Sequence, residues 1–275
     1  MRRLLISFLL LFACVSSFAQ KKMVYLTVEQ IDESFLMCYY NYTHREKGDK
    51  QVVPMLLQVG RDVQKFTCLY DYNSDSLALV FDNQPQDTRF TLNKVNEIRR
   101  KPGCRIEVSW VLYTNYPEGK QSITDRVFLD KFISEEEITI PDWSLVDERK
   151  TIGGYECQKA VTNLYGRVWT AWYTRGIERP DGPWLLKGLP GLVVLAEDDS
   201  GGYKFELQRI EHRKTPIVFD SRDYFKSKRE TVLKAQIKFY DDMSQYAKNT
   251  EIGRQTSDMP QTPRRPYYPL RKVTK

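Results

Sequence analysis

The side chains that most often carry out catalysis are sparse in this sequence of 275 residues. It contains two histidines, His44 beside Arg45 and His212 between Glu211 and Arg213. A serine or cysteine nucleophile needs a base within hydrogen-bond reach, and these charged neighbours predict exposed histidines. No glycine-rich phosphate loop follows a strand and opens a helix. We therefore predict no catalytic residue and no cofactor.

Carboxylates are plentiful, and one run of them matches part of a calcium-loop template. Asp71, Asn73, Asp75 and Asp82 fall at its first, third, fifth and twelfth positions. Ser76 replaces the glycine of the sharp turn, and Asp82 is shorter than the bidentate glutamate that the template requires. The sequence therefore favours a solvated turn and no metal site. A hydrolase or isomerase that uses paired carboxylates is the alternative function, although no two acids stand out.

The cysteines predict disulfides if the protein is exported. Cys38, Cys68, Cys104 and Cys157 lie beyond the N-terminal segment, are even in number and lack Cys-x-x-Cys spacing. Three connectivities are possible, and buried free thiols are the alternative. Zinc is not indicated, because the spacings are wide and histidines are few.

Aromatic residues are dense between positions 169 and 192, and we take five residues there as candidate binding residues: Trp169, Trp172, Tyr173, Trp184 and Leu189. They are expected to line a groove for an apolar ligand or to form a surface for an envelope protein. The alternative is that they are core between sheet and loop. A wide apolar groove beside them would indicate binding, whereas a polar cleft with paired acids would indicate catalysis.

A turn is predicted at Gly188-Leu189-Pro190-Gly191-Leu192. Pro190 sets φ at the first central position, and Gly191 supplies the positive φ that a type II turn needs at the second. Such a turn splays strands and leads the chain around a corner into the next strand. Gly188, Pro190 and Gly191 are therefore expected to be structural.

With these motifs the chain resembles the GLPGLI family of exported proteins, which is typical of Bacteroidota. The resemblance covers residues 143–210 and rests on Tyr155-Glu156-Cys157-Gln158-Lys159-Ala160, Ala171-Trp172-Tyr173-Thr174, Gly182-Pro183-Trp184 and Gly188-Leu189-Pro190-Gly191-Leu192-Val193. Val193 stands where the family name has isoleucine. The resemblance implies an exported, β-rich protein, and it carries over no catalytic residue.

The N-terminus predicts export. Arg2 and Arg3 precede the apolar stretch Leu4 to Phe12, and Ser17-Phe18-Ala19 supplies small residues for signal peptidase. We expect a signal peptide over residues 1–19 and a mature periplasmic protein, with association with the outer membrane as an option. The stretch Leu11-Phe12-Ala13-Cys14 is a poorer lipoprotein box, in which Cys14 would be acylated. The mature chain has no apolar run long enough to span a membrane.

The formal net charge of +6 is concentrated at the two ends of the chain. Two positive charges lie in the signal peptide and four net positive charges lie in residues 250–275, so the body between them is neutral. A nucleic-acid-binding protein carries its positive charge on the folded domain. We therefore expect no nucleic-acid partner.

Alternating apolar and polar residues predict a mainly β protein of the α+β class. We expect an antiparallel, strongly twisted sheet or partly closed barrel, with hairpin turns at 116–120, 165–167 and 199–202. Leu92, Val95 and Ile98 predict a short helix, and one long C-terminal helix is expected at about 221–247. Residues 20–249 then form one domain, and 250–275 a mobile, basic, proline-rich tail. The expected function is a non-enzymatic binding or envelope accessory protein.

Overall fold

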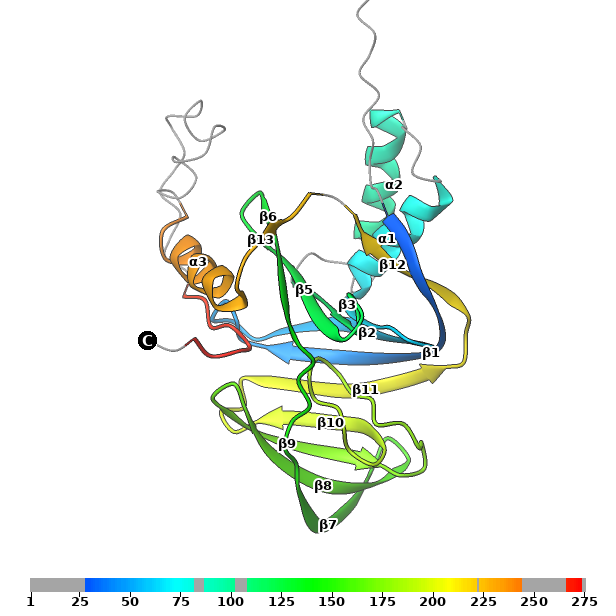
Figure 1. Ribbon diagram of the computed structural model, residues 1–275, viewed down its shortest axis with the longest axis vertical. Coiled ribbons are helices and arrows are strands. Elements are labelled where there is room, and N and C mark those ends of the chain that lie inside the picture. The colour runs from blue at the N-terminus through cyan, green and yellow to red at the C-terminus, as the bar shows by residue number, and fades with distance from the viewer. Residues whose placement is uncertain (1–27, 82–86, 102–107, 222, 244–265, 274–275) are drawn as a thin grey trace, which may run out of the picture.

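The computed structural model describes residues 28–81, 87–101, 108–221, 223–243 and 266–273 (Figure 1). Within them lie three helices, α1 (Leu69–Val80), α2 (Thr88–Arg100) and α3 (Arg229–Asp241). The strands are β1 (Val28–His44), β2 (Gln51–Gly60), β3 (Gln64–Cys68), β4 (Val111–Thr114), β5 (Lys120–Val127), β6 (Asp130–Glu137), β7 (Ser144–Ile152), β8 (Tyr155–Leu164), β9 (Arg167–Thr174), β10 (Leu192–Asp198), β11 (Tyr203–Glu211), β12 (Thr215–Asp220) and β13 (Phe225–Lys226). The prediction of a mainly β protein is confirmed.

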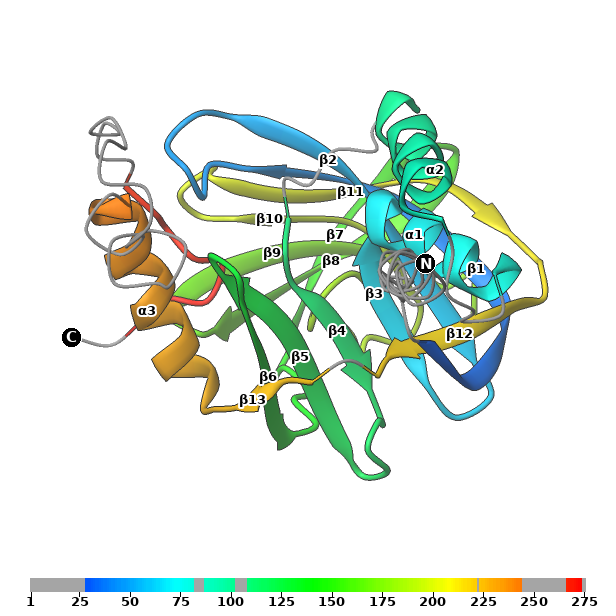
Figure 2. The same ribbon diagram turned by 90° about the horizontal axis from the view of Figure 1, so that it is seen from above.

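All these strands belong to one sheet, in the order β13-β6-β5-β4-β3-β2-β1-β11-β10-β9-β8-β7, with β12 also pairing with β1. The pairings are antiparallel except that of β13 with β6. Seen from above, β4 and β5 run across the direction of β8 to β11 (Figure 2). The sheet is therefore strongly twisted, as predicted, and because β13 and β7 do not pair it is open and not a closed barrel.

Strand β1 is the centre of the sheet. It pairs with β2 along one edge, whereas its other edge pairs first with β12 and then with β11. Successive strand residues point to opposite faces, so Leu36, Cys38, Tyr40 and Tyr42 enter the main core while Met37 and Tyr39 join a smaller cluster with Leu56 on the other face. The main core draws on both halves of the twisted sheet and on the loop between β9 and β10.

The three predicted hairpins are confirmed as β4–β5, β8–β9 and β10–β11. In the β8–β9 turn Tyr165 has φ 48° and Gly166 has φ 77°. Positive φ at both central residues matches a type I′ turn, whose twist suits a two-residue hairpin. This turn fixes the register that brings Gln158 opposite Tyr173.

The helices differ from the sequence prediction. Helix α1 was not predicted, and it contains Asp71, Asn73 and Asp75, so those residues form neither a calcium loop nor a solvated turn. Asp82 lies outside the described residues. The predicted short helix is present as α2, where Asp87 caps the N-terminus by accepting hydrogen bonds from Arg89 N and Phe90 N, both at 3.0 Å.

The expected long C-terminal helix is shorter than predicted. Helix α3 begins at Arg229 and not near Ser221, because Phe225 and Lys226 pair with β6 as strand β13. In the described part of the chain it ends at Asp241. Arg229 is buried near its start and forms an ion pair of 2.7 Å with Asp125 of β5, which fixes the helix against the sheet.

Part of the predicted mobile tail packs against the body. The side chains of Tyr267 and Leu270 are buried. Arg167 donates from Nε to Leu270 O at 2.8 Å and from Nη2 to Pro269 O at 3.1 Å. Tyr268 N donates to Glu46 O at 2.7 Å. Residues 266–273 are thus an ordered part of the fold, since buried side chains and paired backbone groups offset the entropy of ordering.

The predicted disulfides are absent among the described cysteines, because Cys38, Cys68 and Cys157 are free and buried. Cys38 lies on β1 and Cys68 at the end of β3, with β2 between them. Two strand spacings amount to about 9.6 Å, beyond the roughly 7 Å between Cα atoms that a disulfide spans. Cys157 belongs to a separate cluster with Trp172. Cys104 lies outside the described residues.

Candidate functional site

The five candidate binding residues are all buried. Trp169 and Tyr173 have no exposed surface, and Trp172, Trp184 and Leu189 are at most 6% exposed. Trp169 packs against Trp184 and Phe205 at ring-centroid distances of 5.8 and 6.1 Å. Four of the five, all but Trp172, belong to the main core. Their aromatic surface therefore stabilises the fold, and no wide apolar groove exposes Trp172, Trp184 or Leu189.

The loop between β9 and β10 is held by close backbone packing at its glycines. A Cβ atom on Gly191 would lie 2.1 Å from Thr174 O, and one on Gly188, at φ 91°, would lie 2.7 Å from the Ile140 side chain. Gly191 N donates to Leu189 O at 2.8 Å, while Leu192 N donates to Ile177 O. The turn is therefore a three-residue turn about Pro190 and not the predicted type II turn. A side chain at Gly191 would meet the Thr174 backbone, and one at Gly188 would meet Ile140 and also require a residue at positive φ.

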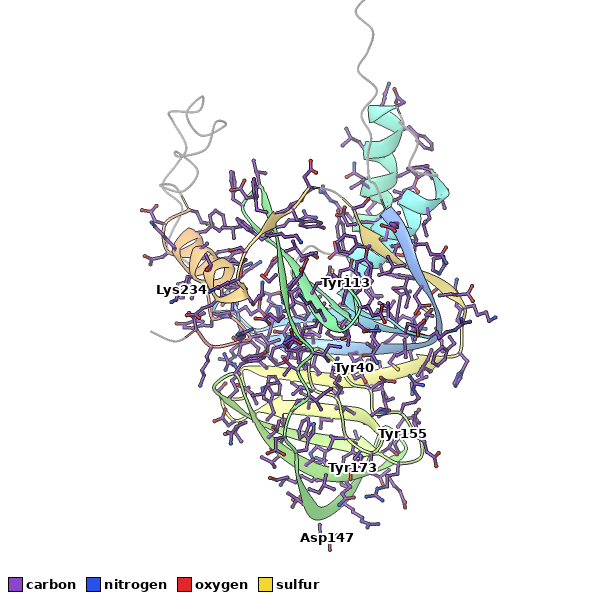
Figure 3. All side chains as sticks on the ribbon, viewed as in Figure 1. Tyr40, Tyr113, Asp147, Tyr155, Tyr173 and Lys234 are labelled. Atoms are coloured by element: carbon purple, nitrogen blue, oxygen red, sulfur yellow. The ribbon has the colours of Figure 1, made fainter. Side chains whose placement is uncertain are left out.

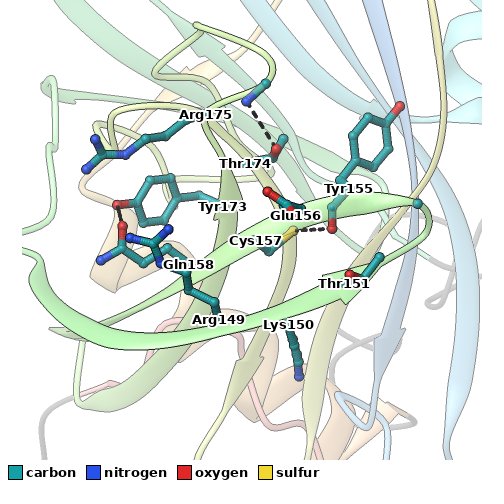
Figure 4. A pocket seen from close by; sticks show the side chains of 12 residues that line it. Arg149, Lys150, Thr151, Tyr155, Glu156, Cys157, Gln158, Tyr173, Thr174 and Arg175 are labelled. Carbon is teal, nitrogen blue, oxygen red and sulfur yellow. Dashed lines mark hydrogen bonds between the residues drawn. The ribbon is translucent and has the colours of Figure 1, made fainter.

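A groove of about 790 Å³ lies beside this loop, at the end of the sheet formed by β7, β8 and the end of β9 (Figure 4). Its lining is mostly polar: Arg149, Lys150, Thr151, Gly154, Tyr155, Glu156, Cys157, Gln158, Tyr173, Thr174, Arg175 and Gly176. Tyr173 is the one candidate binding residue in this lining. Burial raises the pKa of the Cys157 thiol to about 11, so it is a neutral thiol in this wall.

The polar centre of the groove is fixed by strand register. Arg149 lies opposite Gln158, and Gln158 lies opposite Tyr173, so the three share one face of the sheet. The Tyr173 hydroxyl donates to Gln158 Oε1 at 2.9 Å, and Gln158 Nε2 donates to Val146 O at 3.3 Å. Arg175 follows Tyr173 by two residues at the end of β9. Figure 4 shows Arg149 and Arg175 extending beside the hydrogen bond between Tyr173 and Gln158.

A second, smaller cleft of about 210 Å³ lies between α1, β4, β5 and the end of β12. Its lining is rich in acids and in groups that pair with them: Tyr70, Asp71, Ser74, Asp75, Arg99, Ser109, Val111, Tyr113, Thr124, Asp125, Arg126, Asp220 and Tyr224. Figure 3 shows Tyr113 near the upper strands, whereas Tyr155 and Tyr173 lie in the lower half. The cleft and the groove therefore occupy different halves of the molecule.

The acids of this cleft have different environments. Asp125 accepts from Ser109 Oγ at 2.6 Å and from Arg229 Nη1 at 2.7 Å, and Asp75 pairs with the buried Lys65 at 2.5 Å. Asp71 accepts a hydrogen bond from the Cys68 thiol at 3.3 Å. Burial, with the nearby Asp75 charge, raises the pKa of Asp71 to about 6. The cleft thus combines a carboxyl that takes up a proton readily with carboxylates held in ion pairs.

His44 is buried, contrary to the expectation that both histidines are exposed, and His212 is exposed. The His44 ring stacks on Tyr42 at a centroid distance of 4.7 Å, and its Nδ1 accepts a hydrogen bond from Glu46 N at 3.3 Å. Burial lowers the pKa of His44 to about 4, so the ring is neutral at pH 7. With no nucleophile bonded to it in the described residues, His44 is a core residue.

Neither a metal site nor a membrane-spanning helix is present in the part of the chain that the structure describes. No group of three or more His, Cys, Asp or Glu side chains is arranged to hold a metal ion there. In the same residues no helix has the length and apolar character to cross a membrane.

Comparison with known proteins finds a distant likeness. No protein-family model and no curated protein matches the chain. Solved structures that resemble it include PNGF-II in two crystal forms, at TM-scores of 0.48 and 0.46 and sequence identities of 14% and 13%. Each alignment covers 74% of this chain and 32% or 33% of PNGF-II, so the chain spans about a third of that protein.

Sequence reasoning named Tyr173 as a binding candidate and Asp71 and Asp75 as part of a calcium-loop run, but it missed Arg149, Gln158, Arg175 and Asp125. Arg149, Gln158 and Arg175 are far apart in the sequence and meet only through the pairing of β7 with β8 and β8 with β9. The alternating pattern around Tyr155-Glu156-Cys157-Gln158 predicts the strand but not its partners. Asp71 and Asp125 are likewise joined only by the packing of α1 beside the sheet.

Proposed function

We propose that the protein is an exported binding protein that holds a small polar ligand in the groove between β7, β8 and the end of β9. The observation that carries this proposal is the groove itself. Its volume of about 790 Å³ falls within the roughly 300–1,000 Å³ typical of small-molecule sites. Two of its lining side chains, Tyr173 and Gln158, are held together by a hydrogen bond.

The proposal keeps the predicted class of function and changes the expected ligand. Because Trp169, Trp172 and Trp184 are packed inside the protein, the ligand meets exposed arginine side chains and the partly exposed Gln158 and Tyr155, and not a wall of indole rings. Export to the periplasm rests on the predicted signal peptide, and the resemblance to the GLPGLI family supports it. Docking on an envelope protein is the alternative use of the same region.

The proposal is tested by filling the groove. Gly176 lines it, and a Cβ atom there would contact only Thr174 Oγ1, at 3.4 Å. Gly176→Trp should therefore fold while its ring occupies the groove. Val52→Trp is the matched control, because Val52 is 55% exposed on β2, far along the sheet order from the groove.

Native mass spectrometry of protein purified from the periplasm of its own host measures the outcome. We expect wild type and Val52→Trp to carry a bound small molecule that Gly176→Trp lacks. Equal occupancy in all three proteins, or no bound molecule in any, would contradict a ligand-binding groove.

A second candidate function, hydrolysis assisted by carboxylates, is favoured by one observation at the smaller cleft. Asp71 has a pKa of about 6, as suits a general acid near neutral pH, and Asp125 is held in a fixed orientation by Arg229. A panel of chromogenic glycosides and esters at pH 5 to 7 tests this function. Asp71→Asn should abolish any turnover, while Asp147→Asn, on the exposed strand β7, should not. Turnover that survives Asp71→Asn would exclude this role.

A further inference from the structure

Two exposed arginines, Arg149 and Arg175, line the groove without a carboxylate partner in the described part of the chain. Five arginines in the described residues form ion pairs with carboxylates: Arg167 with Asp198, Arg179 with Asp181, Arg209 with Glu211, Arg229 with Asp125 and Arg271 with Glu136. Arg149 and Arg175 line the groove, and neither side chain makes a hydrogen bond or ion pair within the described chain. Their guanidinium groups are available to a ligand.

The side chains of Arg149 and Arg175 extend to the same side of the groove (Figure 4). Arg149, Gln158 and Tyr173 are successive cross-strand neighbours on one face. Arg175 is the first residue after β9, in the turn that follows Thr174. Figure 4 shows both arginines beside the Tyr173–Gln158 hydrogen bond. Tyr173 is fully buried and its hydroxyl is held at 2.9 Å from Gln158 Oε1, so the surface beneath the guanidinium groups is rigid.

The other charged residues of the groove are placed differently. Lys150 lies opposite Cys157 on the other face, where its Nζ sits 3.8 Å from the centre of the Trp172 ring. Glu156 precedes Gln158 by two residues and lies opposite Thr151, farther along the strand toward the β7–β8 turn. It makes no ion pair with a described residue. The groove therefore has a cationic end at Arg149 and Arg175 and an acidic position at Glu156.

We infer that Arg149 and Arg175 form an anion subsite, which takes a carboxylate or phosphate group of the ligand. The planar guanidinium matches both groups through paired N–H donors. The carboxylate of Glu156 then faces the remainder of the ligand, where it accepts from hydroxyl or ammonium groups. This assigns the ligand to small polar compounds with an anionic group at one end and hydrogen-bond donors at the other. The inference rests on the proposed binding function of the same groove.

Titration of the full mature protein with inorganic phosphate and with citrate, followed by calorimetry, tests the subsite. Loss of one charge-assisted pair weakens binding by about tenfold or more. We expect that loss for Arg149→Gln and for Arg175→Gln. Arg149→Lys keeps the charge but loses the paired donors and should fall between wild type and Arg149→Gln. Arg89→Gln, on the exposed surface of α2, should bind like wild type. Tighter binding of phosphate than of citrate, or the reverse, identifies the anionic group.

Affinities that are the same in wild type, Arg149→Gln and Arg175→Gln would overturn the subsite, as would no heat of binding for either anion. Native mass spectrometry separates this failure from failure of the groove. If Gly176→Trp loses the bound molecule while the double variant Arg149→Gln/Arg175→Gln retains it, the groove binds a ligand and the anion subsite is wrong. If Gly176→Trp also retains it, the groove proposal fails.

Discussion

Replacing Glu46 by glutamine should remove a pH dependence of stability that this residue causes. The Glu46 carboxyl is 2% exposed, and it accepts from Tyr42 OH at 2.7 Å and from Tyr267 OH at 3.4 Å. Burial raises its pKa from 4.5 to about 7, and the nearby Asp125 charge adds to this, while Lys47 and Arg229 act against it. Glutamine keeps a carbonyl oxygen for Tyr42 and cannot ionise.

The sign and size of the effect follow from linkage. The folded protein holds the Glu46 proton more tightly than the unfolded chain, so its contribution to stability is complete below pH 4.5 and is lost as pH rises through 7. The difference between the unfolded pKa of 4.5 and the folded pKa of about 7 corresponds to about 3 kcal/mol in the free energy of unfolding. Asp71 acts in the same direction, with a pKa raised to about 6. His44 acts in the opposite direction, because its pKa is lowered to about 4.

Comparison of wild type with Glu46→Gln isolates the residue, since the other groups are common to both proteins. Urea unfolding at pH 4.5 and pH 7.5 gives the free energy of unfolding. We expect Glu46→Gln to gain up to about 3 kcal/mol on wild type between these two pH values. Hydrogen exchange of the Tyr268 amide, which donates to Glu46 O, should show whether the C-terminal segment loosens first. An equal change with pH in both proteins would refute a buried, ionising Glu46.

Three further predictions concern the fold. Gly191→Ala should lower the free energy of unfolding by more than about 3 kcal/mol, because its Cβ would lie 2.1 Å from Thr174 O. Gly201→Ala is the control: it has φ 65° and open space around it, so it should cost only about 1 to 2 kcal/mol. Equal losses of stability in urea unfolding would contradict the close approach at Gly191. Leu270→Ala should lower the free energy of unfolding by about 2 to 5 kcal/mol, because Leu270 is buried in the main core. Truncation after residue 249 should lower it at least as much. A melting temperature unchanged by either change would show that residues 266–273 do not contribute to the core. The three free thiols of the described residues should react with a thiol reagent after denaturation without prior reduction, and not in the native protein. Prompt reaction of the native protein would argue against their burial. Intact mass in the same experiment reports whether the mature chain begins at Gln20.

Local signals made much of the sheet predictable. The Tyr165-Gly166 turn and the alternation on either side of it mark the β8–β9 hairpin, and the structure has that hairpin. Helix α1 was missed because its sequence is rich in residues that favour turns. In the helix, Asn73 Nδ2 donates to Leu69 O and Ser74 Oγ donates to Tyr70 O, so the polar side chains bond to the preceding turn of helix and do not break it.

The sites were less predictable, for a different reason. Tryptophan and tyrosine occur both in cores and in binding grooves, so composition did not show that Trp169 and Trp184 face inward while Arg149 and Gln158 face a groove. The face on which Arg149 lies depends on the register of β7 on β8, which shifts between Val146 and Arg149. A shift of one residue exchanges the two faces of a strand. The sequence carries no local signal for that bulge.

The position of β1 constrains the order in which the chain can fold. Strand β2 follows β1 within a few residues and pairs with one edge of it. The other edge of β1 pairs with β11 and β12, which begin only at Tyr203 and Thr215. Until then the central strand has one unpaired edge, and closing such long loops is slow. The body is completed later still, when Leu270 reaches the core. A chain emerging during synthesis therefore cannot reach its native state before nearly all of it has been made, and its apolar strands lack their partners during that interval.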